Sequence, residues 1–105
     1  MNSAIIVLIE EKQRLERAKK LFSREIAKLP KGSLQLKKRA SQYFYYRVFR
    51  DENNKHTTVY IGKKDSKEVI KTQELIQERK ELEQKFRKVK KDLNSITRLI
   101  PKNER

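Results

Sequence analysis

Hydrophobic residues change their spacing twice along this chain, and this change limits the folds that the chain can adopt. Over residues 3–29 they recur with helical spacing and gather on one side of a predicted helix. Over residues 33–63 apolar and polar residues alternate, which is the period of a β-strand. Over residues 66–100 the helical spacing returns. The sequence therefore predicts an α+β fold with an antiparallel sheet between two long amphipathic helices.

The second predicted helix carries the most regular pattern. Its hydrophobic residues alternate at four and three positions, which is the spacing of a coiled-coil seam. The seam residues are Leu82, Phe86, Val89, Leu93, Ile96 and Ile100. Such a seam needs a partner helix, and the first helix repeats hydrophobic residues every seven positions. These heptad residues are Leu8, Leu15, Phe22 and Leu29. We expect the two helices to pair in a coiled-coil-like manner, either within one chain or between the chains of a homodimer.

Capping residues and a helix breaker mark the ends of both predicted helices. Ser3 is the expected N-cap of the first helix, and Pro30 ends this helix because proline lacks the backbone N–H that a helix needs. Asp65 or Ser66 caps the second helix, with Asp65 and Glu68 in the positions of a capping box.

Three strands of an antiparallel meander are predicted between the helices, over residues 33–39, 43–50 and 56–61. Asp and Asn residues at 51–55 favour a turn between the last two strands. Alternation divides the side chains between the two faces of this sheet. The expected core face carries Phe44, Tyr46, Val48, Val59 and Ile61. The expected outer face carries Tyr43, Tyr45, Arg47 and Tyr60, unless helices cover both faces.

Basic residues dominate the chain and concentrate in its middle third. A length of 105 residues predicts a single domain, residues 1–105, whose 40% charged residues leave a thin core. The net charge is +14, and the segment 30–64 alone holds nine basic against two acidic residues, half of this excess. Such a chain is expected to bind polyanions, which are DNA, RNA, a nucleoprotein complex or an acidic membrane surface. The alternative is that lysines only solvate the long helices.

Catalytic and metal-binding patterns are not found in the sequence. Cysteine is missing, His56 is the only histidine, and no glycine-rich phosphate loop occurs. We therefore expect a protein that is not an enzyme and that holds no cofactor and no metal. No apolar stretch approaches the ~18–20 residues of a membrane span, and no secretory signal is recognisable, so a cytoplasmic protein without a membrane partner is predicted.

Aromatic and basic residues are interleaved in the second predicted strand and around it. Cations neutralise phosphates and aromatic faces stack on bases, so this combination indicates a nucleic-acid surface. The candidate binding residues of the sheet and of its exit are Lys37, Lys38, Arg39, Tyr43, Tyr45, Arg47, Arg50, Tyr60, Lys63, Lys64 and Lys67. On the second helix, Arg87, Lys88 and Lys91 share one side and form a candidate phosphate-contacting stripe. The alternative for these three cations is a solvated helix face.

Short motifs follow one another through the middle of the chain. They are the entry Leu29-Pro-Lys-Gly-Ser-Leu34, the strands Tyr43-Phe-Tyr-Tyr-Arg47 and Thr58-Val-Tyr-Ile-Gly-Lys63, and a basic helix with heptad spacing. This order resembles a set of small uncharacterised bacterial proteins carried by mobile elements, over about residues 25–95. The resemblance implies a mobile-element context and no mechanism. Many of those proteins carry cysteines between the first two strands, where this chain has Lys37-Lys-Arg-Ala-Ser-Gln42, so no metal site carries over.

The order of a sheet followed by a helix also resembles the arm-binding domains of phage integrases, which lay a three-stranded sheet into the major groove. This second resemblance concerns architecture only and carries no function by itself. Together the patterns favour a non-enzymatic nucleic-acid-binding protein of phage or mobile-element origin. The alternatives are an inhibitor or adaptor of a nucleoprotein effector, of the anti-CRISPR type, and a coiled-coil assembly module. The choice between DNA and RNA stays open.

Overall fold

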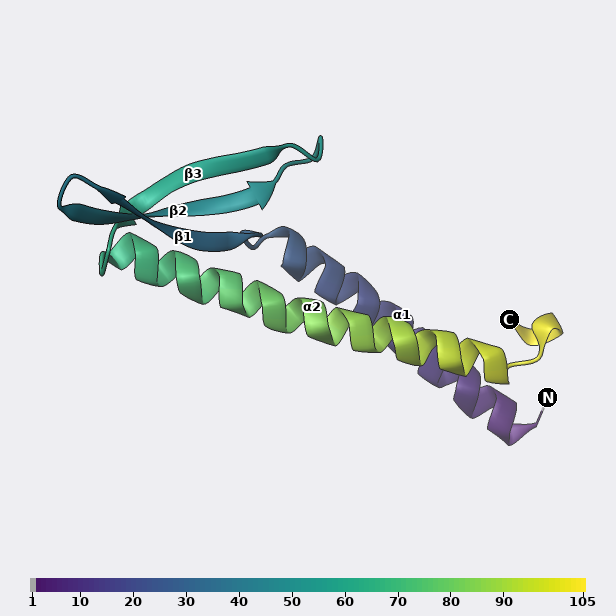
Figure 1. Cartoon of the computed structure of the whole chain (residues 1–105). Coiled ribbons are helices and arrows are strands. Elements are labelled where there is room, and N and C mark those ends of the chain that lie inside the picture. Colours follow the sequence, from purple (N-terminus) through teal and green to yellow (C-terminus); the bar gives the residue numbers. More distant parts are fainter. Residues whose placement is uncertain (1) are drawn as a thin grey trace. The chain divides into compact units, whose positions relative to one another are not determined.

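A computed structural model describes residues 2–105 and contains two helices with a three-stranded antiparallel sheet between them in sequence (Figure 1). The predicted α+β class is therefore confirmed. The elements are α1 (Ser3–Ala27), β1 (Ser33–Arg39), β2 (Gln42–Arg50), β3 (His56–Lys63), α2 (Lys67–Leu99) and the short 3₁₀ helix η1 (Lys102–Glu104). The chain forms two compact units: a helical unit of residues 1–28, described from residue 2 on, with residues 81–105, and a sheet unit of residues 29–80. Helix α2 contributes to both.

The N-cap of helix α1 lies one residue before the predicted cap. The side chain of Asn2, whose backbone is extended, accepts a hydrogen bond from the backbone N–H of Ile5 at 2.9 Å. The prediction of Ser3 as the cap is wrong, because Ser3 is already helical and Asn2 satisfies the free N–H group. The helix ends at Ala27, two residues before the predicted end. Leu29 precedes Pro30, and a residue before proline disfavours the helical conformation.

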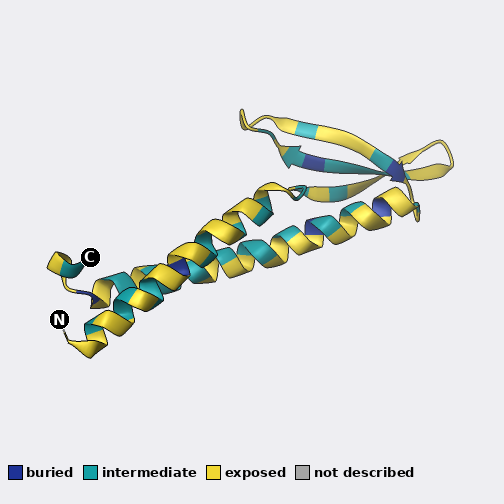
Figure 2. Cartoon of the chain, turned by 180° about the vertical axis from the view of Figure 1, so that it is seen from behind, coloured by how far each residue is buried: buried dark blue, intermediate teal, exposed yellow. Residues whose placement is uncertain are grey.

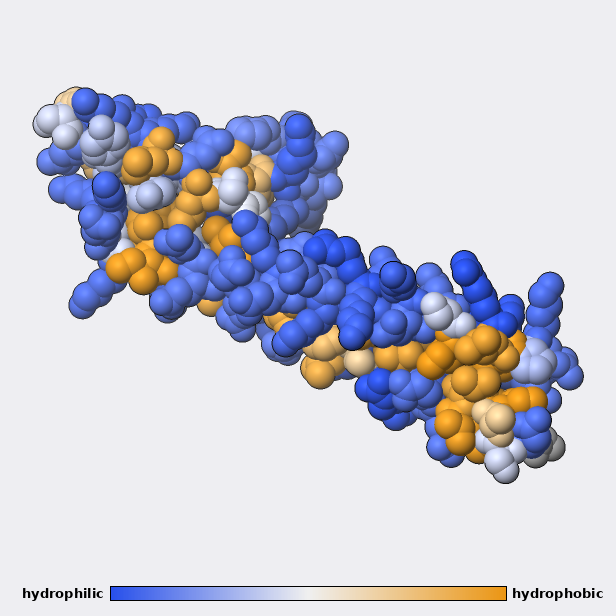
Figure 3. Space-filling view, turned by 60° about the horizontal axis from the view of Figure 1, so that its bottom comes forward, coloured by the Kyte–Doolittle hydropathy of each residue, from blue (hydrophilic) through white to orange (hydrophobic). Residues whose placement is uncertain are grey.

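The helical unit places α1 and residues 81–99 of α2 side by side (Figures 1 and 2). Leu15 of α1 and Ile100 after α2 are buried, with 4% and 1% of their surface exposed. The other predicted seam residues of α2 are half-buried: Leu82, Phe86, Val89, Leu93 and Ile96. Figure 3 shows hydrophilic side chains over most of the visible surface and an apolar cluster where this unit holds the chain termini. The helical unit thus buries its apolar side only in part.

The sheet has the predicted meander order β1-β2-β3 with β2 in the centre. Asp51 organises the turn between β2 and β3, because its Oδ1 atom accepts from the backbone N–H groups of Asn53 and Lys55, each at 2.9 Å. Asn54 in this turn adopts a left-handed φ of 61°. Asparagine tolerates this conformation and aspartate bonds readily to nearby backbone, so the residues that predicted the turn also form it.

A β-bulge in the sheet changes the faces that alternation predicted. Tyr45 pairs with Gly62 but the next residue, Tyr46, pairs with Tyr60, so Ile61 is an extra residue in β3. The bulge moves Tyr60 to the face of Phe44 and Tyr46. Ring centroids lie 5.5 Å apart for Tyr46 and Tyr60, and 6.1 Å apart for Phe44 and Tyr60. The prediction that Tyr60 lies opposite to these two residues is wrong, because strict alternation does not allow for the extra residue. We call this side of the sheet the ring face.

The opposite side of the sheet, which we call the helix face, packs on the first turns of α2. A Cβ atom built on Gly62 would lie 3.6 Å from Val69 Cγ2, and Gly62 shares its face with Tyr45. Leu34, the partner of Arg47 on this face, lines a surface groove together with Ile76. Tyr45 and Arg47 lie on this face and are half-buried, so their predicted outer, exposed position is wrong.

The core of the sheet unit is small, as the composition predicted. Val48 in β2, Val69 and Ile76 in α2 are buried, with 9%, 4% and 6% of their surface exposed. Val59, expected in the core, is 39% exposed because it lies on the edge strand β3. Figure 2 shows exposed residues along much of β1 and β3. Many sheet side chains are thus free to meet a partner.

The start of α2 and the linker before β1 are fixed by specific contacts. Ser66 Oγ accepts from the N–H of Val69 at 3.4 Å, so Ser66 is the cap. The capping box expected from Asp65 is not formed, because Asp65 has a left-handed φ of 67° and precedes the cap. Arg79, which interrupts the hydrophobic stripe of α2, donates to the carbonyl oxygen of Leu29 at 2.7 Å. A cation on the apolar stripe therefore binds the chain between α1 and β1.

Candidate nucleic-acid interface

The ring face gathers aromatic rings and cations from all three strands. Pairing places Lys37 of β1 beside Phe44, with Lys63 of β3 on the other side of Phe44. Two cations lie over the ring of Tyr46: Lys37 Nζ at 4.9 Å from the ring centroid and the Arg39 guanidinium carbon at 5.6 Å. Tyr60 keeps 54% of its surface exposed. The ring face therefore offers an aromatic surface bordered by positive charge.

A second group of the same composition lies on the helix face, at the hairpin between β1 and β2. Tyr43 is 43% exposed, and the Nζ atoms of Lys38 and Lys64 lie 5.8 Å and 5.9 Å from its ring centroid. The backbone N–H of Lys64 also donates to the carbonyl of Tyr43 at 3.1 Å. This group differs from the ring face in having one tyrosine, which makes no ring–ring contact among residues 2–105.

Carboxylates are far less common than cations around both groups. The strands contain no acidic residue, and the acids nearest in sequence are Asp51 and Glu52 in the turn and Asp65 before α2. In the part of the chain that the structure describes, no ion pair is formed by Lys37, Lys38, Arg39, Lys63 or Lys64. These cations are therefore available to contact phosphates and to displace the counterions condensed on a nucleic acid.

Two of the predicted binding arginines have structural partners instead. Arg47 donates to the carbonyl oxygen of Lys31 at 2.9 Å, and its guanidinium lies 4.0 Å from the ring centroid of Phe49. Arg50 donates to the carbonyl of Asn54 at 3.0 Å and thus supports the turn after β2. Each of these hydrogen bonds leaves other donor groups of the guanidinium available. The geometry gives both residues a role in the fold, and Lys67 remains exposed at the start of α2.

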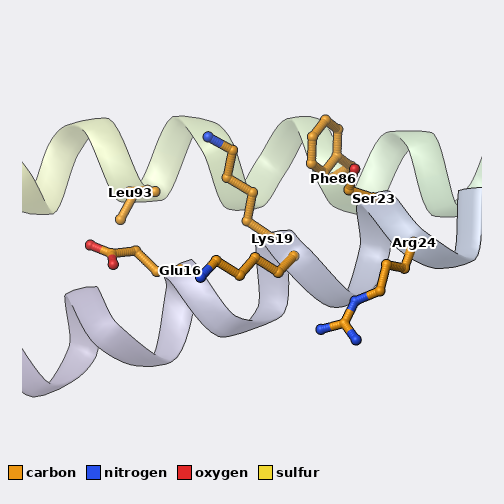
Figure 4. Close-up of a pocket in the computed structure, with 7 residues that line it drawn as sticks. Glu16, Lys19, Ser23, Arg24, Phe86 and Leu93 are labelled. Carbon is orange, nitrogen blue, oxygen red and sulfur yellow. The ribbon is translucent and has the colours of Figure 1, made fainter.

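The helical unit contains the other predicted cations and a groove that the sequence analysis missed. Arg87, Lys88 and Lys91 are exposed on α2. A groove of about 590 Å³ runs between α1 and α2 (Figure 4). Its lining residues are Glu16, Lys19, Lys20, Ser23, Arg24, Phe86 and Leu93. The residues at positions 16, 20, 23 and 24 fall on one side of a helix. This spacing is the feature of the sequence that indicates a common surface on α1.

The cations of the helical unit are partly paired with carboxylates. Lys12 and Glu16 lie 3.6 Å apart, Lys28 and Glu25 lie 3.2 Å apart, and Arg14 Nε donates to Glu11 Oε2 at 2.9 Å. The hydrogen bond from Arg14 lowers the pKa of Glu11 below its ordinary value, and the same contact raises the pKa of Arg14. These pairs are three or four residues apart on one helix, where such side chains are neighbours.

The described residues contain no cluster of three or more potential metal-ligating histidines or acids. No helix in residues 2–105 has the length and apolar character needed to cross a membrane. Comparisons of the chain with models of protein families, with curated proteins and with solved structures found no match. The resemblance to mobile-element proteins stays a prediction, and the function has to be argued from the geometry of the two units.

Proposed function

We propose that this chain is a non-enzymatic nucleic-acid-binding protein that uses the basic aromatic surface of its sheet. The single observation that supports this function best is the set of cations without carboxylate partners around Tyr46 and Tyr60. A proposed phage or mobile-element origin depends on the resemblance of the sequence motifs alone. The proposed ligand class includes DNA and RNA.

The physical argument combines two contributions to binding. Protein cations that contact phosphates release the counterions condensed on the nucleic acid, and this release favours binding at low salt. Exposed rings add stacking on bases, which tolerates any sequence because every base has a π-face. Lys37, Arg39 and Tyr60 lie on one face of the sheet, so the two contributions act on the same stretch of nucleic acid.

The test is a titration of labelled single-stranded DNA, duplex DNA and an RNA hairpin at several salt concentrations. Affinity should fall steeply with salt, with a log–log slope of about 0.7 to 0.9 for each phosphate contacted. A slope near zero for all three probes would contradict the proposal. The probes should stay chemically intact during the titration, because the proposed protein is not an enzyme.

A matched pair of triple variants locates the binding surface. Replacing Lys37, Lys38 and Arg39 with Ser removes three charges from the sheet, and replacing Arg87, Lys88 and Lys91 with Ser removes three charges from α2. We expect the sheet variant to reduce the log–log salt slope by the contribution of about two to three phosphate contacts. The helix variant should retain most of the wild-type slope. The opposite result would move the interface to the helical unit.

A protein effector as the direct partner is the competing outcome. In that case, capture of the effector would persist after nuclease treatment, and the sheet variant would weaken this capture with no nucleic acid present. Loss of capture after nuclease would instead support the proposed nucleic-acid interface. This experiment separates an inhibitor of a nucleoprotein machine, such as an anti-CRISPR protein, from a nucleic-acid-binding module.

A second candidate function is assembly through the helical unit, for which we propose coiled-coil-like pairing of α1 with α2 and a homodimer. The observation that favours it is the run Ile5–Ile9, which is apolar all around α1 and leaves Ile6 and Val7 43% and 61% exposed. Leu99 near the end of α2 is 66% exposed. Sedimentation equilibrium should give a dimer that Val7→Asp dissociates, and a monomer at all concentrations would contradict this candidate.

A further inference from the structure

The two exposed tyrosines of the sheet unit have different surroundings. Tyr43 is flanked by two lysine Nζ atoms at 5.8 Å and 5.9 Å from its ring centroid. Tyr60 has no cation over its ring within the described residues, and its neighbours are two other rings. The planes of Tyr46 and Tyr60 meet at 69°, and those of Phe44 and Tyr60 at 51°. Inclined neighbours of this kind hold a ring in place without stacking on it.

Tyr60 therefore has the properties of a platform for a flat ligand. It is 54% exposed, it is oriented by two rings, and it lies next to the bulge that places it on the ring face. A nucleobase that stacks on this ring gains the contribution that aromatic platforms supply in single-strand-binding proteins. A tyrosine whose ring is approached by its own lysines has less free surface for a base.

The cations of the ring face lie within reach of such a base. Lys37 Nζ is 4.9 Å and the Arg39 guanidinium 5.6 Å from the Tyr46 ring centroid, which is itself 5.5 Å from the Tyr60 centroid. Either cation therefore lies at most about 11 Å from the ring centroid of Tyr60. Both cations thus lie close to the phosphates that flank a base stacked on Tyr60. One strand thus meets a stacking ring and two phosphate-binding cations at once.

From this arrangement we infer that the ring face selects single-stranded nucleic acid, with one base stacked on Tyr60 and adjacent phosphates on Lys37 and Arg39. This inference rests on the proposed nucleic-acid-binding function. In a duplex the bases are stacked on one another and unavailable to Tyr60, so a duplex retains only the phosphate contacts. Single strands should bind more tightly than duplexes of equal charge.

The experiment compares wild-type protein with Tyr60→Ala and with the control Val59→Ala, which changes a 39% exposed neighbour on the helix face. The probes are a labelled 20-mer of oligo(dT) and a 20-base-pair duplex of mixed sequence at one salt concentration. Stacking of one base contributes about 1–3 kcal/mol, which is about 5- to 150-fold in affinity. We expect Tyr60→Ala to lose this factor for oligo(dT) and less than about twofold for the duplex, and Val59→Ala to lose less than about twofold for both.

Two further variants separate stacking from folding. Tyr60→Phe keeps the ring and should retain the affinity for oligo(dT), whereas Tyr60→Leu keeps an apolar side chain beside Tyr46 and should lose it. Circular dichroism and thermal unfolding identify any variant that does not fold, and Tyr60→Leu replaces Tyr60→Ala in that case. Full affinity of Tyr60→Leu for oligo(dT) would overturn the inference.

The results also distinguish this inference from the function on which it rests. Equal or tighter binding of the duplex by wild-type protein, with a steep salt slope, would overturn single-strand selection and leave nucleic-acid binding in place. Failure of wild-type protein to bind oligo(dT), the duplex and an RNA hairpin at low salt would overturn both.

Discussion

The sheet unit and the helical unit carry the same net charge but arrange it differently. Residues 29–80 hold thirteen basic and six acidic side chains, and the remainder of the chain holds fifteen basic and eight acidic ones, so each unit has an excess of seven. In the helical unit, carboxylates of α1 pair with cations one turn away. In the sheet, cations lie over aromatic rings. Net charge alone therefore does not locate a nucleic-acid surface. The groups next to each cation decide whether the cation is available to contact a phosphate.

The units also differ in how tightly the backbone is constrained. Gly32 in the sheet unit has a φ of 103°, and a Cβ atom there would lie 2.2 Å from the carbonyl oxygen of Val48. The described part of the helical unit has no comparable position, because its described residues have no positive φ. The sheet unit depends on local geometry that a single methyl group disrupts.

Gly32→Ala should have the largest effect on stability. The substitution combines a strained φ with a clash against backbone atoms that cannot move aside, so we expect a loss of about 3–5 kcal/mol or failure to fold. Urea unfolding followed by circular dichroism measures this loss. Lys31→Ala is the control, since its side chain is exposed and only its backbone carbonyl is used by Arg47. A Gly32→Ala protein as stable as Lys31→Ala would contradict the turn geometry.

Truncation of core residues should have the next largest effect on stability, and this effect should be larger in the sheet unit than in the helical unit. Ile76 in the sheet unit is 6% exposed, so Ile76→Ala should lower the free energy of unfolding by about 3 kcal/mol. Leu93 in the helical unit is half-buried, and Leu93→Ala should lower it by about 1–2 kcal/mol. Thermal unfolding of both variants at one protein concentration measures the difference. An equal or larger effect at Leu93 would mean that the seam is covered more fully in solution, as the proposed homodimer requires.

The junction between β3 and α2 provides a third, smaller test. A Cβ atom on Gly62 would lie 2.7 Å from Ser66 Oγ, the atom that caps α2. Gly62→Ala should push this hydroxyl away from Val69 N–H and lower stability by about 1 kcal/mol, the typical effect of losing a cap. Ser66→Ala should have a similar effect, and the double variant should add little because both changes remove one interaction. Full additivity in urea unfolding would show that the two residues act separately.

Most of the secondary structure followed from the spacing of hydrophobic residues. The limits of β1 were predicted to the residue, and those of the other strands and of α2 to within one or two residues. The predicted faces of Val59 and Tyr60 are the wrong way round, because Val59 pairs with Arg47 and Tyr60 pairs with Tyr46. The bulge at Ile61 depends on how β3 pairs with β2, and alternation within one strand holds no signal for it.

The residue types in the sequence predicted which residues belong to the candidate site, but not how these residues are arranged on the sheet. The cations Lys37 and Arg39 and the ring of Tyr60 were identified from their residue types, but their common face with Phe44 and Tyr46 was not. Arg47 is an arginine like Arg39 but has a structural role, because its guanidinium donates to the backbone carbonyl of Lys31. Sequence spacing does not record which backbone carbonyls a long side chain can reach.

The smallest expected effect concerns the paired charges of the helical unit and their response to pH. Arg14 lowers the pKa of Glu11 in the folded protein, below its ordinary value of 4.5. A carboxyl group whose pKa is lowered by folding stabilises the folded state above its unfolded pKa, and this contribution is lost as the pH falls through the folded pKa. Glu11→Gln should therefore reduce stability slightly at pH 7 and make no difference at about pH 2.

The contact is exposed, so salt should weaken the difference between wild type and Glu11→Gln at neutral pH. Carbon-13 NMR of the Glu11 carboxyl group measures its pKa directly, and thermal unfolding at several pH values measures the stability. Glu52→Gln in the sheet turn is the matched control, because Glu52 is an exposed carboxylate that forms no ion pair within residues 2–105. A pKa of Glu11 at or above 4.5, or an equal pH response in both variants, would contradict the pairing that distinguishes the helical unit from the sheet.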